Sequence, residues 1–138
     1  MNHFRITEEQ IVCALPQSWT ENGTDGGHVI FCGTIRTRNK GKDVIHIDFE
    51  AYEPMVIREL EKIASRIKAE TGVNRLLLIH RTGRVLPGEV AVLAAASGTH
   101  RSEAFRACEM LMNELKRSVP IWKKERTSDG ETWITPTP

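Results

Sequence analysis

The chain has 138 residues, 40% of them hydrophobic, with 19 Lys and Arg residues against 18 Asp and Glu residues. This length suffices for one domain with its own core, and the near-neutral charge gives no general electrostatic reason to expect nucleic acid or membrane binding. No segment has the eighteen or so consecutive apolar residues that span a bilayer, and the start lacks the pattern of a secretory leader. We therefore expect a single cytoplasmic domain in which any anion-binding site is local.

The first half of the chain predicts strands and one helix. After an N-terminal strand and a polar loop within residues 1–25, residues 28–35 are predicted to form a buried strand. The basic loop that follows is expected to be a hairpin connection to a second strand at residues 44–51. Alternation predicts that this second strand is half exposed, with Ile45, Ile47 and Phe49 facing inward and His46, Asp48 and Glu50 facing outward.

Helical spacing of apolar residues predicts a helix at residues 54–71, begun by Pro54 and ended by Gly72. Strands are expected at residues 75–80 and 89–97, and the second is apolar enough to be covered on both faces. A second helix is predicted from residue 99 or 101 to residue 117, and Pro120 prevents its continuation. Its apolar stripe consists of Ala104, Cys108, Leu111, Met112 and Leu115.

The order strand, strand, helix, strand, strand, helix, followed by a polar tail, predicts an α+β fold. We expect helices packed on a largely antiparallel sheet. Residues 1–138 are expected to form one domain, with a core at residues 26–133 and a short tail at residues 134–138.

The three cysteines, Cys13, Cys32 and Cys108, are far apart, odd in number and without Cys-x-x-Cys spacing. This pattern argues against a disulfide framework and against a zinc site, and it fits a reducing compartment. Cys32 lies near a basic loop, which would suit a persulfide sulfur carrier. Its place in an apolar strand favours a buried, inert thiol instead.

Three polar clusters indicate a site for an anionic ligand. Residues 36–42 follow the first buried strand, residues 97–102 precede the second helix, and residues 116–126 follow from its end. In the third cluster, Lys116 and Lys123 flank a Pro-Ile-Trp sequence. Cations at a helix end also complement the carbonyl end of the helix dipole, which is the alternative explanation for this cluster taken alone.

Several separated motifs occur over roughly residues 26–133. They are Phe31-Cys32-Gly33-Thr34-Ile35-Arg36, Phe49-Glu50-Ala51-Tyr52-Glu53-Pro54-Met55, Ile79-His80-Arg81-Thr82-Gly83, Pro87-Gly88-Glu89, His100-Arg101-Ser102-Glu103-Ala104-Phe105 and Leu115-Lys116 with Pro120-Ile121-Trp122-Lys123-Lys124-Glu125. Their residues and order closely resemble the large, catalytic subunit of molybdopterin synthase. The resemblance implies an α/β hammerhead-like fold with an additional small antiparallel sheet.

The resemblance also implies a reaction and its partners. Family members are sulfurtransferases of molybdenum cofactor biosynthesis that convert cyclic pyranopterin monophosphate into molybdopterin. The dithiolene sulfurs come from the C-terminal Gly-Gly thiocarboxylate of a small ubiquitin-like partner subunit, with no metal or other cofactor. The implied assembly is a homodimer at the centre of a heterotetramer. A non-catalytic module that binds a ubiquitin-like tail or a phosphorylated small molecule is the alternative, although no glycine-rich phosphate loop supports nucleotide binding.

The family's functional residues are carried onto this sequence by motif. The two catalytic lysines fall at Lys116 and Lys123, and the apolar pocket wall falls at Phe31 and Met112. The implied substrate contacts are Thr34, Ile35, Arg36, His100, Arg101, Lys116, Lys123, Lys124 and Glu125. The end of the sequence lacks a basic residue that some relatives place there, which affects only a peripheral contact.

The residue types suit the implied chemistry. Arg36 and Arg101 can each bind phosphate oxygens through two parallel hydrogen bonds. Lys116 can act as a point charge beside the thiocarboxylate or as a proton-transfer group, and the sequence leaves both roles open. Fifteen helical residues separate Arg101 from Lys116 by roughly 22 Å, which is too far for one small substrate. A site shared across a two-fold dimer is therefore expected.

Overall fold

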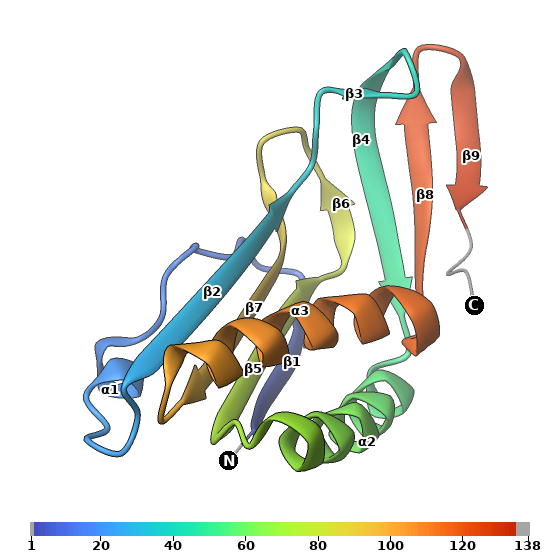
Figure 1. Cartoon of the computed structure of the whole chain (residues 1–138). Helices are drawn as coiled ribbons and strands as arrows, with labels where there is room; N and C mark the ends of the chain where they lie inside the picture. The colour runs from blue at the N-terminus through green and yellow to red at the C-terminus, as the bar shows by residue number, and fades with distance from the viewer. Residues whose placement is uncertain (1, 135–138) are drawn as a thin grey trace.

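The computed structural model describes residues 2–134, which form two sheets, two long helices and one short helix (Figure 1). The first sheet has the order β1-β5-β7-β2, and the second has the order β3-β4-β8-β9 with β6 paired to β4. The elements are β1 (Asn2–Thr7), α1 (Gln17–Thr20), β2 (Gly27–Thr34), β3 (Arg38–Asn39), β4 (Lys42–Ala51), α2 (Glu53–Thr71), β5 (Arg75–Arg81), β6 (Gly83–Val85), β7 (Val90–Gly98), α3 (Arg101–Ser118), β8 (Ile121–Thr127) and β9 (Gly130–Ile134). No helix among residues 2–134 is both long and apolar enough to cross a membrane.

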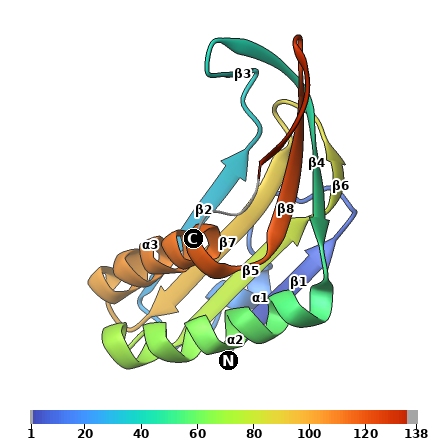
Figure 2. The same cartoon turned by 90° about the vertical axis from the view of Figure 1, so that its right-hand side faces the viewer.

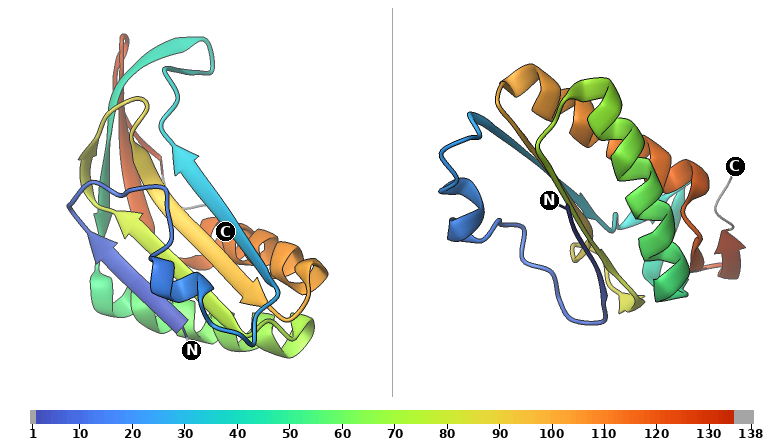
Figure 3. Two further views of the ribbon diagram at one scale, coloured as in Figure 1. Left: turned by 90° about the vertical axis from the view of Figure 1, so that its left-hand side faces the viewer. Right: turned by 90° about the horizontal axis from the view of Figure 1, so that it is seen from below.

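The predicted α+β class is confirmed, because α2 and α3 lie on one face of the first sheet (Figure 3). Within that sheet β1 is parallel to β5, whereas β5, β7 and β2 are antiparallel neighbours. The segment that contains α1 crosses the opposite face, where Ile11, Leu15 and Trp19 pack against Leu77 and Leu93. Strand β7 is therefore covered on both faces, as its apolar sequence predicts.

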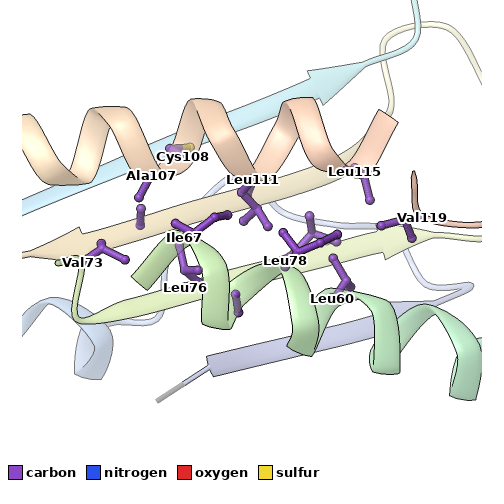
Figure 4. Packing of buried hydrophobic residues seen from close by; sticks show 14 of the residues in the cluster. Leu60, Ile67, Val73, Leu76, Leu78, Ala107, Cys108, Leu111, Leu115 and Val119 are labelled. Atoms are coloured by element: carbon purple, nitrogen blue, oxygen red, sulfur yellow. The ribbon is translucent and has the colours of Figure 1, made fainter. Parts of the chain in front are cut away.

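The main core lies between the two helices and the first sheet (Figure 4). Leu60 and Ile67 of α2 meet Leu76 and Leu78 of β5 there, and all four side chains are at most 1% exposed. Removing one such side chain typically costs 2–5 kcal/mol. Both boundaries of α2 follow the predicted signals. Pro54 lies in the first turn, and Gly72, after the last turn, adopts a left-handed conformation with φ of 77°.

The predicted polar tail is wrong, because residues 121–134 form the antiparallel hairpin β8–β9. Figure 2 shows β8 running beside β4, away from the two helices. Charged residues fill both faces of β8, so the sequence has no apolar alternation that would reveal a strand. Residues 135–138 of the expected tail lie outside the described residues.

The predicted hairpin between the first two strands is also wrong. Strand β2 joins β7 in the first sheet, whereas β4 joins β8 in the second. The basic loop instead forms the short β3–β4 hairpin, whose turn residues Lys40 and Gly41 have positive φ values of 53° and 77°. The loop thus carries the chain from one sheet to the other.

The predicted alternation in β4 fails at one point. Ile45 is 50% exposed, whereas His46 is only 8% exposed. The pairing of β4 with β8 shifts register between Val44 and His46, so a bulge inserts one extra residue. Beyond the bulge the alternation returns, and Ile47 and Phe49 are buried as predicted.

The cysteine interpretation is wrong in two respects. Cys13 and Cys32 form a disulfide with a Cα–Cα distance of 6.1 Å, and Cys32 is therefore not a free, inert thiol. The pairing depends on the tertiary path of the N-terminal segment over the first sheet, which sequence spacing does not reveal. Cys108 is free and buried. The cysteines thus no longer support a reducing compartment, and cytoplasmic localisation remains a prediction from the other observations.

Candidate active site

A cavity of about 410 Å³ opens where the two sheets and the end of α3 meet. Most of its wall is apolar and is provided by β2, β4, β7 and α3. Two lysines, Lys116 and Lys123, contribute positive charge to this wall. The lining residues are Phe31, Gly33, Thr34, Phe49, His80, Ala91, Val92, Met112, Leu115, Lys116, Val119, Ile121, Lys123 and Ile134.

The end of α3 and the start of β8 bring the two lysines to one cavity. Lys116 lies in the last turn of α3, after which Val119 is extended and Pro120 ends the helix. Side chains alternate along β8, so Lys123 and Glu125 share one face and Lys124 faces the other way. Strand β8 begins where α3 ends (Figure 1). The turn between them thus lets Lys116 and Lys123 line the same cavity.

Electrostatics make Lys123 an unusual lysine. Burial lowers the pKa of its ammonium group, and the positive charges of Lys116, Arg36 and Lys40 lower it further. The carboxylate of Glu125 opposes this shift. A lysine with a lowered pKa releases a proton more readily, so Lys123 can serve in proton transfer as well as in charge stabilisation.

Glu125 is held in place close to Lys123 and the cations around it. It is 7% exposed and accepts a hydrogen bond of 2.9 Å from the side-chain amide of Asn39. The residue belongs to the second sheet, where it pairs with Ile47 of β4. Its fixed negative charge offsets part of the repulsion among the cavity's cations.

His80 is a cavity residue to which the sequence assigned no role. It ends the apolar part of β5, is 6% exposed and meets the ring of Phe49 edge-on at a centroid distance of 5.0 Å. Burial lowers its pKa to about 4, and the nearby Lys123 charge acts in the same direction. The only sequence signal for His80 was its place in the motif with Arg81 and Gly83. The fold was needed to show that it lines the cavity and is not only a core histidine.

Three of the other candidates on or near β2 and α3 line the cavity, and one does not. Thr34, Phe31 and Met112 line it. Ile35 is buried in the core, and its backbone N–H and C=O are bonded to Glu89 and Gly88.

Two candidate cations lie outside the lining. Arg36 is exposed at the end of β2, and its guanidinium donates a long hydrogen bond of 3.4 Å to Asn39. Lys124 is on the far face of β8, 3.6 Å from the carboxylate of Glu131 and over the ring of Trp133. Its side chain therefore does not reach the cavity of its own chain.

His100 and Arg101 lie at the opposite end of α3 from Lys116. His100 caps the helix, and its backbone N–H donates a 2.7 Å hydrogen bond to the side chain of Glu103. Arg101 is exposed in the first turn. One chain therefore does not gather all the predicted residues, in agreement with the separation expected from helix length.

A group of possible metal ligands occurs on the other side of the second sheet. His46, Asp48 and Glu131 have ligand atoms within 4.8 Å of one another. However, Arg84 binds Asp48 through two nitrogens, and Lys124 and Arg126 flank Glu131. Three cations already neutralise two carboxylates, so this group is an ion-pair network that disfavours a divalent ion.

Solved structures establish the class of fold. The chain resembles the crystal structure of molybdopterin synthase from Staphylococcus aureus with a TM-score of 0.85 and 35% identity, over 94% of both chains. It also resembles a molybdopterin biosynthesis MoaE protein from Burkholderia ambifaria, with a TM-score of 0.81 and 31% identity, over all of this chain and 92% of the other.

Sequence comparison gives the family. The model described as MoaE protein matches residues 6–118, and the chain belongs to this family. A molybdopterin synthase catalytic subunit 1 from Mycobacterium tuberculosis is 46% identical over 132 residues, which cover 96% of this chain and 90% of the relative. The molybdopterin synthase catalytic subunit of Nostoc is 41% identical over 134 residues, which cover 96% of this chain and 81% of the relative. The family resemblance inferred from the motifs is thus confirmed.

Proposed function

We propose that this chain is the sulfur-transferring subunit of a molybdopterin synthase. It takes sulfur from the C-terminal Gly-Gly thiocarboxylate of a small ubiquitin-like partner and adds it to cyclic pyranopterin monophosphate, forming the dithiolene of molybdopterin. The observation that carries the proposal is one apolar cavity that contains both Lys116 and Lys123. The names of the relatives support it.

The cavity suits two anions that must meet. A thiocarboxylate and a phosphate-bearing substrate repel each other, and fixed cations offset that repulsion while holding the reacting atoms together. Lys116, at the helix end, is assigned to the thiocarboxylate. Lys123 is assigned to the pterin, where its lowered pKa suits proton transfer during sulfur addition.

The apolar wall has its own role in this proposal. Phe31 and Met112 lie beside the lysines, and Thr34 offers a hydroxyl at the same edge. An extended peptide tail can dock along such a wall, which excludes water and strengthens the electrostatic interactions within. In each transfer the thiocarboxylate sulfur bonds to a pterin carbon, and one water molecule then hydrolyses the carbon–sulfur bond to the partner, which leaves with a C-terminal carboxylate.

Phosphate binding is assigned to arginines from two protomers. Arg36 follows the cavity residue Thr34 in the sequence, and its charge contributes to the lowered pKa of Lys123, which supports its assignment to the same site. His100 and Arg101 are roughly 22 Å from Lys116 along α3, so they serve a site of a second copy in a homodimer. Lys124, Glu125 and Ile35 are kept as surrounding substrate contacts, with Glu125 acting through its charge on Lys123.

A reconstitution assay tests this function. The purified chain is mixed with thiocarboxylated partner and cyclic pyranopterin monophosphate, and the dithiolene product is measured by mass spectrometry. We expect product only when all three components are present. Tight binding of the partner without product would instead support the alternative, a non-catalytic module that holds a ubiquitin-like tail, and binding of the precursor alone would indicate a phosphate-binding protein.

A further inference from the structure

Asn39 lies between two charged groups of the candidate active site. It is the last residue of β3, and its side chain reaches across β4 to β8, because the order of the second sheet is β3-β4-β8. The amide nitrogen donates a hydrogen bond of 2.9 Å to the Glu125 carboxylate, and the amide oxygen accepts one of 3.4 Å from the Arg36 guanidinium. One neutral side chain thus joins Arg36 to Glu125.

The chemistry of the two partners fixes the orientation of this amide. A guanidinium only donates hydrogen bonds and a carboxylate only accepts them, so the oxygen of Asn39 must face Arg36 and the nitrogen must face Glu125. The opposite orientation would set donor against donor and acceptor against acceptor. An aspartate at this position would lack the donor and a lysine would lack the acceptor, so an amide suits both partners.

The Glu125 end of this link is the firmer one. Glu125 is 7% exposed, its bond to Asn39 is the shorter of the two, and its backbone is paired with β4. The backbone of Asn39 is held as well, since the two-residue turn Lys40–Gly41 sets it opposite Lys42 in the β3–β4 hairpin. Asn39 is therefore a fixed acceptor.

Arg36, by contrast, is exposed and depends on this contact for its position. Among residues 2–134 no carboxylate lies within ion-pair distance of its guanidinium. A long exposed side chain samples many rotamers, and ordering it when a ligand binds costs entropy. Asn39 holds Arg36 through one nitrogen, Nη2, and adds no negative charge, so the guanidinium keeps its charge and its other donors for phosphate oxygens.

We propose that Asn39 is a positioning residue that anchors the Arg36 guanidinium to Glu125 of β8, and so holds Arg36 beside the lysine cavity for the phosphate of the precursor. Glu125 is two positions from the cavity residue Lys123 on the same face of β8, so the link sets the position of Arg36 relative to Lys123. The inference rests on the proposed function, which assigns the phosphate-bearing substrate to these cations.

Comparison of Asn39→Ala, Arg36→Ala and the double variant in the reconstitution assay tests this role. We expect Asn39→Ala to raise the KM for cyclic pyranopterin monophosphate roughly fivefold, as for one lost hydrogen bond, and to leave kcat within about twofold of the wild type. Because Asn39 acts through Arg36, the double variant should have the KM of Arg36→Ala alone. An unchanged KM in Asn39→Ala, or a further rise in the double variant, would overturn the proposal.

Two further variants separate the link from the general condition of the hairpin. Asp43→Asn breaks the ion pair with Arg38 in the same hairpin and leaves the Asn39 link untouched, so its KM should stay near the wild-type value. Asn39→Asp keeps an acceptor for Arg36 but offers Glu125 a second carboxylate in place of a donor, so its KM should rise. Equal rises in Asp43→Asn and Asn39→Ala, or a normal KM in Asn39→Asp, would contradict anchoring.

NMR of the isolated chain gives a readout that needs no turnover. The side-chain amide protons of Asn39 are assigned with Asn39→Ala, and their signals should move both in Arg36→Ala and in Glu125→Gln. Signals that respond to only one of these substitutions, or to neither, would refute the link. If the wild type forms no dithiolene, the proposed function fails and these signals still decide on the link. If the wild type turns over without the expected KM pattern, only this inference fails.

Discussion

Lys116 and Lys123 are seven positions apart in the sequence, but they enter the cavity from different elements. Lys116 ends α3, and Lys123 lies on β8 after the turn at Val119 and Pro120. Two lysines that served only the helix dipole would be redundant and exposed. Lys123 is instead partly buried among like charges, which makes its charged form less stable. Groups with such shifted pKa values are concentrated at functional sites.

Replacement of either lysine tests this view. We expect Lys116→Ala and Lys123→Ala each to lower the rate of dithiolene formation at least about a hundredfold, the scale of a lost proton-transfer or charge-stabilising group. Partner binding and thermal stability should change little.

Arg117→Ala is the matched control, because Arg117 is a neighbouring cation of the same helix turn that pairs with Glu114 outside the cavity. Its rate should stay near that of the wild type. Near-normal rates in both lysine variants would contradict the catalytic assignment.

His80 also predicts how stability depends on pH. Its pKa is about 4 in the folded chain, against 6.5 for an ordinary histidine. Below pH 6.5 the unfolded chain gains a proton that the folded chain does not accept until about pH 4, so stability falls as the pH falls through this window. The loss from this group is about 3 kcal/mol at most.

Urea unfolding of wild type and His80→Gln at pH 7 and pH 4.5 measures this effect. The difference in stability between the two pH values should be smaller in His80→Gln. The pKa values of Asp25, Asp48 and Glu89 are lowered, so their contributions are lost as the pH falls through those lowered values. Identical pH dependence of the two proteins would refute the burial of a neutral His80.

The helices and strands that the sequence predicts correctly are those in which one local physical pattern dominates. Apolar spacing and the signals of Pro54, Gly72 and Pro120 located both long helices to within about two residues. The uninterrupted apolar run of β7 correctly predicted cover on both faces. These features are determined by residues close together in the sequence, so the sequence alone is enough to predict them.

Elements that depend on distant pairing were missed. Strand β8 is rich in charge and is a strand because β4 and β9 pair with it. The bulge at Ile45 likewise depends on the partner strand. For the site, the motifs named both cavity lysines, but the separation of Lys124 from the cavity and the position of His80 required the assembled sheets.

The disulfide joins the N-terminal segment to the first sheet. Cys32 faces the side where Ile11, Leu15 and Trp19 pack, whereas its neighbours Phe31 and Gly33 line the lysine cavity. Closing a loop between residues 19 apart is expected to stabilise the fold by about 3 kcal/mol.

Chemical denaturation of the double variant Cys13→Ser, Cys32→Ser should show about this loss. Added reductant should lower the wild type to the same stability and leave the variant unchanged. Because the bond is on the far face of β2, dithiolene formation should persist wherever the chain is folded. If reductant leaves the free energy of unfolding of the wild type unchanged, the disulfide does not contribute to stability.

The length of α3 limits which residues of one chain can contact the same substrate molecule. Its start carries His100 and Arg101 and its end carries Lys116, and one small substrate does not span roughly 22 Å. A two-fold dimer joins the two ends in one site, with His100 and Arg101 supplied to the cavity of the other protomer.

Mixing variants measures this sharing. Homodimers of Lys116→Ala and of Arg101→Ala should each be nearly inactive. After subunit exchange about half the dimers are mixed, and each mixed dimer has one site with all its wild-type residues, so about a quarter of wild-type activity should return. Exchange without recovery would indicate that each site lies within a single chain.

The most direct test of sulfur transfer follows the sulfur atom itself. Partner thiocarboxylate labelled with sulfur-34 is reacted in a single turnover with unlabelled chain and precursor, and the product is weighed by mass spectrometry. We predict two labelled sulfurs in each dithiolene, partner returned as carboxylate, and the same result when Cys13, Cys32 and Cys108 are replaced in a folded variant. Unlabelled sulfur in the product, or a product that requires one of these cysteines, would contradict direct transfer from the partner.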